Sequence, residues 1–159
     1  MRVTVTPASL GEKAIVWRLL QLYHYDFTEF IDELKLEPNG EYAYRYLDNY
    51  WDPEPGEQRF PFLIRADDDL AGFALVRFVN NHYVMAEFFV MRPYRRHNVG
   101  ATAAKDVFRR FPGDWIVHEL PKNRPAQAFW RRIIDEFSVG DFTEKVEDDG
   151  AYTQRFTSR

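Results

Sequence analysis

The segment from Glu87 to Ala104 joins an apolar run, a basic turn and the start of a helical pattern. The free N–H groups in the first turn of a helix, together with the helix dipole, favour a bound anion such as phosphate. Arg95, Arg96 and His97 add side-chain donors at the same place, and a guanidinium can hold a phosphate through two parallel hydrogen bonds. The segment therefore predicts a site for a diphosphate ligand.

Glu87 is the leading candidate for a general base. It interrupts the apolar run Val84–Val90, where a carboxylate costs free energy unless it faces a cleft or a partner. Such surroundings raise a carboxyl pKa toward the range in which a base is useful. The alternative is a structural carboxylate that pairs with a neighbouring arginine or with the backbone.

His118 and Glu119 are the second candidates for acid–base chemistry. They end a predicted strand, and the sites of parallel sheets open at that end. The alternative for both is a packed or surface pair. The four histidines lie on separate predicted elements, without the short spacing of metal ligands, so no metal site is predicted.

Two motifs in the chain resemble those of the GNAT-type N-acetyltransferases. Arg95-x-x-Asn98-x-Gly100 resembles the family's Arg/Gln-x-x-Gly-x-Gly/Ala signature, with Asn98 in place of the first glycine. Asn is the non-glycine residue that best tolerates a positive φ, so the turn can still form. The second motif, Asn123-x-x-Ala-x-x-Phe-Trp130, resembles the family's Asn-x-x-Ala-x-x-Leu/Phe-Tyr element, although the Gly-Phe that commonly follows is absent.

The resemblance implies acetyl-CoA as the cofactor and an amine as the acceptor. In the family the first motif cradles the pyrophosphate, and the second flanks the pantetheine arm and the sulfur. The backbone N–H of Val90 is the implied donor to the thioester carbonyl, by resemblance to the family's strand bulge. The implied cofactor-binding residues are Phe89, Val90, Met91, Arg95, Arg96, His97, Asn98, Val99, Gly100, Ala101, Thr102, Asn123, Phe129 and Trp130.

Acetyl transfer requires a neutral amine, and a free alkyl amine is neutral in only about one molecule in a thousand at neutral pH. We therefore expect Glu87, or else His118, to act as a base. Trp130 stands where the family often has an acidic tyrosine, and an indole does not ionise near neutrality. Tyr152 is the expected acid in its place, although a thiolate can also leave unaided.

The acceptor pocket is expected near the first two helices, where aromatic residues are dense. Tyr23, Asp26 and Tyr46 are the predicted substrate-binding residues, because aromatic faces and a carboxylate suit a cationic amine. The alternative for the tyrosines is helix packing. The primary amine could belong to a small molecule or to a protein. Two other functions stay open, namely a non-catalytic acyl-CoA sensor, which Trp130 favours, and an interaction domain.

These residues must be positioned by an α/β (α+β) fold with a mixed, mostly antiparallel central sheet of about six to seven strands and helices on both faces. Hydrophobic periodicity and turn residues predict its elements. Strands are expected at Arg2–Thr6, Phe60–Ala66, Ala71–Val79, His82–Met91, Trp115–Glu119, Phe142–Val146 and Tyr152–Thr157. Helices are expected from Leu10 to about Phe30, over Tyr42–Tyr50, and at Ala101–Phe111 and Ala126–Phe137.

Composition narrows the class of protein. The length of 159 residues predicts one acetyltransferase-like domain over residues 1–159. A net charge of −4 provides no basic field for nucleic acid, and no apolar run is long enough to span a membrane. The absence of cysteine and of a signal peptide pattern predicts a cytoplasmic protein. Its expected partners are acetyl-CoA and the amine, and a homodimer is left open.

Overall fold

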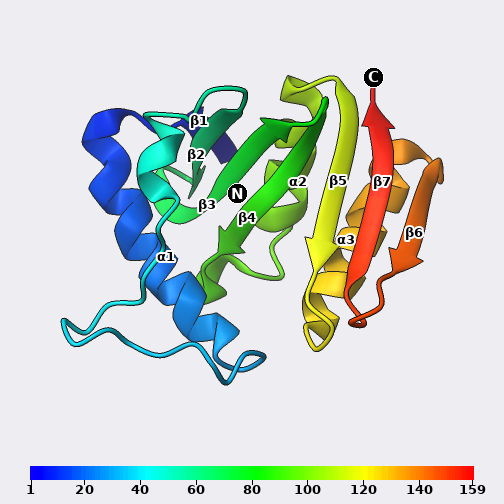
Figure 1. The fold of residues 1–159 in the computed structure, drawn as a ribbon. Coiled ribbons are helices and arrows are strands. Elements are labelled where there is room, and N and C mark those ends of the chain that lie inside the picture. The colour runs from blue at the N-terminus through cyan, green and yellow to red at the C-terminus, as the bar shows by residue number, and fades with distance from the viewer.

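The computed structural model describes residues 1–159 and is built on one seven-stranded sheet in the order β1-β2-β3-β4-β5-β7-β6 (Figure 1). The strands are β1 (Val3–Pro7), β2 (Gln58–Ala66), β3 (Asp69–Val79), β4 (His82–Val90), β5 (Gly113–Glu119), β6 (Phe142–Val146) and β7 (Tyr152–Ser158). The helices are α1 (Lys13–Phe27), α2 (Val99–Arg110) and α3 (Arg124–Ser138), with short 3-10 turns at η1 (Leu10–Glu12), η2 (Leu47–Tyr50) and η3 (Arg92–Tyr94).

Two tight hairpins join the predicted strands β2, β3 and β4 into an antiparallel meander. Asp67 and Asp68 connect β2 to β3 with φ of 49° and 73°, and Asn80 and Asn81 connect β3 to β4 with φ of 53° and 64°. Asn and Asp tolerate the left-handed conformation that two-residue hairpin loops require. The short polar turns therefore set the register of the three central strands.

Strands β4 and β5 are parallel, and they are the only parallel neighbours in the sheet. Their ladder contains only the pairs Tyr83–Trp115 and Val84–Ile116, at the start of each strand. Figure 1 shows the two strands together at that end and apart at their C-terminal ends. The chain crosses from β4 to β5 through α2, and the splay of these two strands opens a notch in the middle of the sheet.

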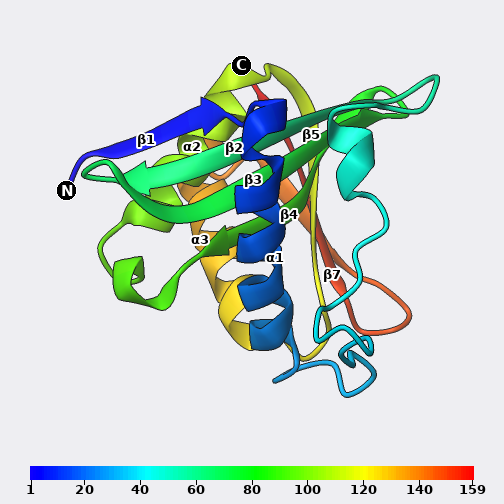
Figure 2. The same ribbon diagram turned by 90° about the vertical axis from the view of Figure 1, so that its left-hand side faces the viewer.

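The helices cover both faces of the sheet, as expected, and each face has its own hydrophobic core (Figure 2). On one face, α1 packs through Val16 and Leu20 against Phe73 of β3. On the other face, α2 and α3 enclose Phe108 and Trp115, which are both fully buried. No helix is both long enough and apolar enough to cross a membrane. The two cores hold the strands on either side of the notch.

The helix predicted over Tyr42–Tyr50 is wrong, because only the 3-10 turn η2 forms there. The backbone N–H of Tyr42 donates to Gln21 Oε1 at 2.6 Å, and its carbonyl accepts from Gln21 Nε2 at 3.0 Å. These two bonds fix the Tyr42 backbone against α1, and the second occupies the carbonyl that would accept from the Tyr46 N–H in a helix beginning at Tyr42. The aromatic spacing reflects packing of an irregular segment on α1, not helical periodicity.

Candidate active site

A β-bulge in β4 determines which face of the sheet carries Glu87. Glu87 lies opposite Leu75, and Met85 lies opposite Val76, so Ala86 is the extra residue between them. Leu75 belongs to the core under α1, whereas Val76 and Met85 belong to the core under α2 and α3. An extra residue shifts the alternation of a strand by one. The bulge therefore turns the Glu87 side chain toward α1, whereas Met85, two residues earlier, faces the opposite side of the sheet.

Burial raises the pKa of Glu87 to about 7, and the hydroxyl of Tyr23 on α1 acts against this rise. Part of the Glu87 side chain remains accessible, but its carboxyl group is set deep among protein atoms. Tyr23 itself is buried, which raises the pKa of its phenol, with the nearby carboxylate adding to that shift. A carboxyl group that titrates near neutrality can accept a proton under physiological conditions.

The backbone at the end of β4 faces the notch at Val90. The N–H of Met91 donates to Ala71 O at 2.7 Å, so Met91 presents its backbone groups to β3. Successive strand residues point their N–H and C=O groups in opposite directions, and those of Val90 therefore point toward the gap before β5. The Val90 carbonyl there accepts from Arg95 Nε at 2.7 Å. The bulge lies at Ala86, four residues before the position that the resemblance suggested for the donor.

The turn between η3 and α2 presents a run of backbone amides that have no partner in the protein. Arg96 and Asn98 take left-handed conformations with φ of 66° and 59°. The first amide of α2 to make a backbone hydrogen bond is Thr102 N, which donates to Asn98 O at 3.0 Å. The amides of residues 96–101 donate to no acceptor in the chain. Six free donors at a helix N-terminus can bind an anion.

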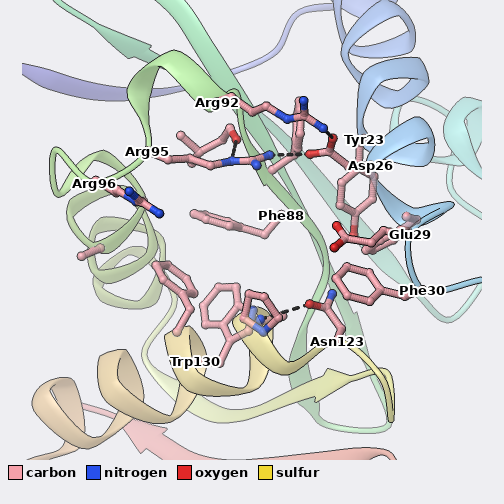
Figure 3. Close-up of a pocket in the computed structure, with 18 of the residues that line it drawn as sticks. Tyr23, Asp26, Glu29, Phe30, Phe88, Arg92, Arg95, Arg96, Asn123 and Trp130 are labelled. Atoms are coloured by element: carbon pink, nitrogen blue, oxygen red, sulfur yellow. Dashed lines mark hydrogen bonds and ion pairs between the residues drawn. The ribbon is translucent and has the colours of Figure 1, made fainter.

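The turn borders a cavity of about 830 Å³ that runs from α1 across the notch to α3 (Figure 3). Its basic side chains are Arg92, Arg95, Arg96 and Arg132. Of the predicted cofactor-binding residues, it is lined by Phe89, Val90, Arg95, Arg96, Asn98, Gly100, Ala101, Asn123, Phe129 and Trp130. The remaining four, Met91, His97, Val99 and Thr102, do not line it, and the Val99 side chain is buried in the core.

The first turn of α3 forms the opposite wall of this cavity. Asn123 caps the helix, because its Oδ1 accepts from Ala126 N at 3.1 Å. Trp130 is buried and meets Phe88 edge to face, with 5.0 Å between the ring centroids. A Cβ atom on Gly100 would lie 3.2 Å from the Phe129 ring, so α2 and α3 approach each other closely at this wall of the cavity.

Asp26 lies beside the arginines of the first cavity, whereas the sequence analysis predicted it in the acceptor pocket. Its carboxylate accepts from Arg92 at 2.9 Å and from Arg95 at 2.5 Å, as Figure 3 shows. It lines the cavity with the free amides and not the second cavity described below. Asp26 therefore occupies guanidinium donors that a phosphate group could use.

Replacing Asp26 with Asn is expected to strengthen the binding of CoA about threefold, because it removes a negative charge and frees Arg95 for phosphate. Val90 O still orients Arg95 in the variant. Calorimetric titration with CoA at low and at moderate salt measures the effect, which should shrink as salt screens the charges. Weaker binding in the variant would mean that Asp26 positions the arginines for the ligand.

A second cavity, of about 720 Å³, is lined by residues of β4, of the end of β5 and of the turn between β6 and β7. Glu87, His118 and Glu119 line it. It shares six lining residues with the first cavity, namely Tyr23, Phe27, Phe88, Asn123, Ala126 and Trp130. The two cavities therefore meet at an aromatic wall, and Glu87 stands beside that wall.

The other predicted catalytic and acceptor residues are only partly brought together. His118 lines the second cavity, contacts Thr153 Oγ1 through Nδ1 at 2.9 Å, and has its pKa lowered by burial. Tyr152 lines neither cavity, because its ring lies under the Arg131 guanidinium at 5.5 Å. Tyr46 also lies outside both cavities, where Arg45 covers its ring. Neither Tyr152 nor Tyr46 therefore reaches the cavities to replace the tyrosine that Trp130 substitutes.

Several lining residues were missed by the sequence interpretation. Phe88 lines both cavities, and Arg132 adds a cation to the first. Residues Glu147, Asp148 and Asp149 line the second cavity, although the sequence suggests only a turn for them. One sequence signal could have identified these acids. An Asp-Gly turn needs a single aspartate, whereas three consecutive acidic residues precede Gly150.

Comparison with models of known protein families identifies one matching family. A model of the acetyltransferase (GNAT) family matches residues 19–134. The chain therefore belongs to the GNAT family of acetyltransferases, as the two motifs suggested, and its enzyme class is that of the N-acetyltransferases. The family uses acetyl-CoA. A comparison with curated protein sequences gives no significant match.

Solved structures share the fold over nearly the whole chain. Ard1 from Thermoplasma volcanium matches with a TM-score of 0.63 and 16% identity, over 100% of this chain and 99% of that one. PaiA N-acetyltransferase from Thermoplasma acidophilum, in complex with coenzyme A, has a TM-score of 0.63 and 11% identity, with 99% of both chains covered. The ribosomal-protein-S18-alanine N-acetyltransferase from Escherichia coli has a TM-score of 0.61 and 13% identity, over 99% of this chain and 94% of that one.

Proposed function

We propose that this protein transfers an acetyl group from acetyl-CoA to a primary amine by direct attack of the amine on the thioester. The observation that carries the proposal is the pairing of a free-amide turn in one cavity with a buried carboxyl group, Glu87, in the adjoining cavity. The two cavities share six lining residues, among them Phe88 of β4, the strand that borders the notch. An anionic donor and an amine can therefore meet within the sheet from opposite sides.

The residues of the first cavity fit coenzyme A. The amides of residues 96–101 and the guanidinium groups of Arg95 and Arg96 would hold the diphosphate. The wall that Phe129 and Val90 form beside Gly100 would hold the pantetheine arm. When bound, acetyl-CoA supplies the thioester, whose acyl carbon forms a bond to nitrogen as its bond to sulfur breaks.

Glu87 would take the proton that the attacking amine must lose, because its pKa of about 7 leaves it partly ionised at neutral pH. The Val90 N–H, which points into the notch, would donate to the thioester carbonyl oxygen. The thiolate would leave without Trp130 or Tyr152 as its acid, since Trp130 cannot donate a proton and Tyr152 lines neither cavity. Because a thiol has a pKa of about 8.5, its thiolate can act as a leaving group without being protonated first.

The proposal is tested by incubating the protein with acetyl-CoA and a panel of small and peptide amines while free thiol release is followed. We expect amine-dependent thiol release together with a CoA-dependent rise in melting temperature. A rise in melting temperature without turnover on any amine would support the acyl-CoA sensor instead. The absence of both effects would leave an interaction domain.

A further inference from the structure

Two buried polar side chains take no part in the proposed reaction. Glu119, at the end of β5, is 4% exposed, and Gln154 of β7 is fully buried. Gln154 pairs with Val117 in the β5–β7 ladder, and Val117 belongs to the core under α2 and α3. Glu119 lies two residues after Val117, so both polar side chains are on that face of the sheet, opposite the face that carries Glu87.

The contact between these two side chains leaves two oxygens without a donor. Glu119 Oε1 accepts from Gln154 Nε2 at 2.7 Å. Glu119 Oε2 and Gln154 Oε1 are both buried and have no hydrogen-bond partner. An unpaired buried polar atom is costly, and here both unpaired atoms belong to the two groups that the 2.7 Å bond already joins. A proton on Glu119 Oε2 would satisfy both, because the O–H would donate to Gln154 Oε1.

The orientation of the Gln154 amide is set by a second carboxyl group. Its Nε2 also donates to Glu144 Oε1 at 2.9 Å. Glu144 in turn accepts three hydrogen bonds from the Arg131 guanidinium, at 3.0, 3.3 and 3.1 Å. If the amide were turned over, its oxygen would face the oxygens of both carboxyl groups. The amide nitrogen therefore points at Glu119 and Glu144, and the amide oxygen is left for a donor.

The surrounding charges decide which carboxyl group keeps a proton. Two carboxylates that share one amide nitrogen repel each other, so one of them is favoured in its neutral form. Burial acts to raise the pKa of Glu144, but the hydrogen bonds from Arg131 and Gln154 leave it lowered. Burial raises the pKa of Glu119 to about 8, and the charge of Glu144 adds to the rise. The proton therefore belongs on Glu119.

No other group around Glu119 favours its charged form. The titratable or charged groups that act on its carboxyl group, pair with it in the sheet or line the same cavity are Glu144 of β6, Arg131 of α3, Tyr152 of β7, Glu87, His118, and the turn residues Glu147, Asp148 and Asp149. Glu87 and His118 lie on the opposite face of the sheet, and the turn adds only acids. Arg131, the one cation on this face, is bound to Glu144.

We propose that Glu119 keeps its proton in the folded protein and forms with Gln154 a reciprocal acid–amide pair, which ties the end of β5 to β7 and opens when the proton is lost. In this pair Gln154 Nε2 donates to Glu119 Oε1, and the Glu119 Oε2–H donates to Gln154 Oε1. Loss of the proton leaves two acceptor oxygens with no hydrogen between them. The pair is thus a pH-sensitive fastening at the end of β5, from which His118 lines the second cavity.

The proposal fixes the direction in which stability depends on pH. The carboxyl group has an ordinary pKa of 4.5 in the unfolded chain and a higher pKa in the folded protein. The pair therefore stabilises the fold fully below about pH 4.5, and this contribution is lost as pH rises to about 8. Between these values unfolding releases one proton from Glu119, which raises the unfolding constant about tenfold per pH unit.

The test replaces Glu119 with Gln, whose amide has the shape of a protonated carboxyl group and can form both bonds of the pair. Urea unfolding of the parent and of Glu119→Gln is measured from about pH 5 to about pH 8. We expect the two unfolding constants to agree within about threefold near pH 5, and the parent's to be about tenfold or more larger near pH 7. Removing this carboxyl group should thus stabilise the protein at neutral pH.

The matched control is Glu144→Gln, which makes the same chemical change on the carboxyl group that Arg131 holds. Because the pKa of Glu144 is lowered, its contribution to stability is present above its unfolded pKa and is lost as pH falls. Glu144→Gln should therefore be less stable than the parent near pH 7, with a difference that narrows toward about pH 4. The two variants should have effects of opposite sign at neutral pH.

The protonation state of Glu119 is also read directly from the NMR signal of its carboxyl carbon, assigned through bonds from the backbone. This signal should stay close to the position of a protonated carboxyl group from about pH 5 to about pH 7. The measurement uses the parent protein and needs no folded variant. A signal at the ionised position in this range would overturn the proposal. So would a Glu119→Gln variant that is less stable than the parent near pH 7, or a stability difference between the two that does not change with pH.

Discussion

Replacing Glu87 with Gln should lower kcat at neutral pH by about a hundredfold or more while leaving CoA affinity unchanged. Glutamine fills the same space next to Tyr23 but cannot accept the proton of the amine. In the parent protein the rate should rise as pH increases through about 7, because the carboxyl group must lose its own proton before it can act. The base is therefore inactive below that pH and fully available above it.

The pH profile separates a catalytic role from a structural one. In the Gln variant the inflection near the pKa of Glu87 should disappear, and the rate should keep rising as the free amine itself deprotonates near pH ~10. The deficit should therefore shrink at high pH. Measuring kcat/KM across this range for both proteins tests the role, with Glu136→Gln on the outer surface as the control. An unchanged profile in the Glu87 variant would transfer the role to His118 or to water.

Replacing Gly100 with Val should weaken CoA binding by about tenfold or more. The new Cβ atom would lie 3.2 Å from the Phe129 ring and 3.6 Å from Val90, and its methyl groups would extend into the space beside the free amides. The variant should still fold, because the contact is with the edge of a side chain and Val is a better helix former than Gly. Calorimetry with CoA and a melting curve measure the two effects separately.

The control for Gly100→Val is Asn98→Gly. Asn98 has a φ of 59°, a conformation that glycine adopts without strain, so this variant should keep or improve CoA affinity. If Gly100→Val bound CoA as well as the parent does, the proposed position of the diphosphate beside α2 would be wrong.

Local chemistry made much of the fold and the turn of free amides predictable. The hairpin turns at Asp67–Asp68 and Asn80–Asn81, and the left-handed residue Asn98, follow from residue types that tolerate a positive φ. The order of strands and helices follows from hydrophobic periodicity, and the free amides follow from the placement of a basic turn before a helix. In these cases the interactions that determine the structure join residues only a few positions apart in the sequence.

Contacts between distant parts of the chain could not be predicted from the sequence. The bulge at Ala86 has no glycine or proline signal, yet it decides the face that carries Glu87. The pairing of Asp26 with Arg95 joins residues 69 positions apart, and the Gln21 clamp on Tyr42 spans 21 positions. Glu147, Asp148 and Asp149 fit a local turn pattern, and nothing in that pattern shows that they also line the second cavity.

The central claim is that the amides of residues 96–101 hold the diphosphate of coenzyme A. Hydrogen–deuterium exchange of peptides covering residues 95–102, with and without CoA, tests it most directly, because these amides have no partner in the protein alone. We predict that saturating CoA slows their exchange by about tenfold or more, while the amides of the outer strand β6 are unaffected. Equal exchange rates for these peptides with and without saturating CoA would contradict the claim.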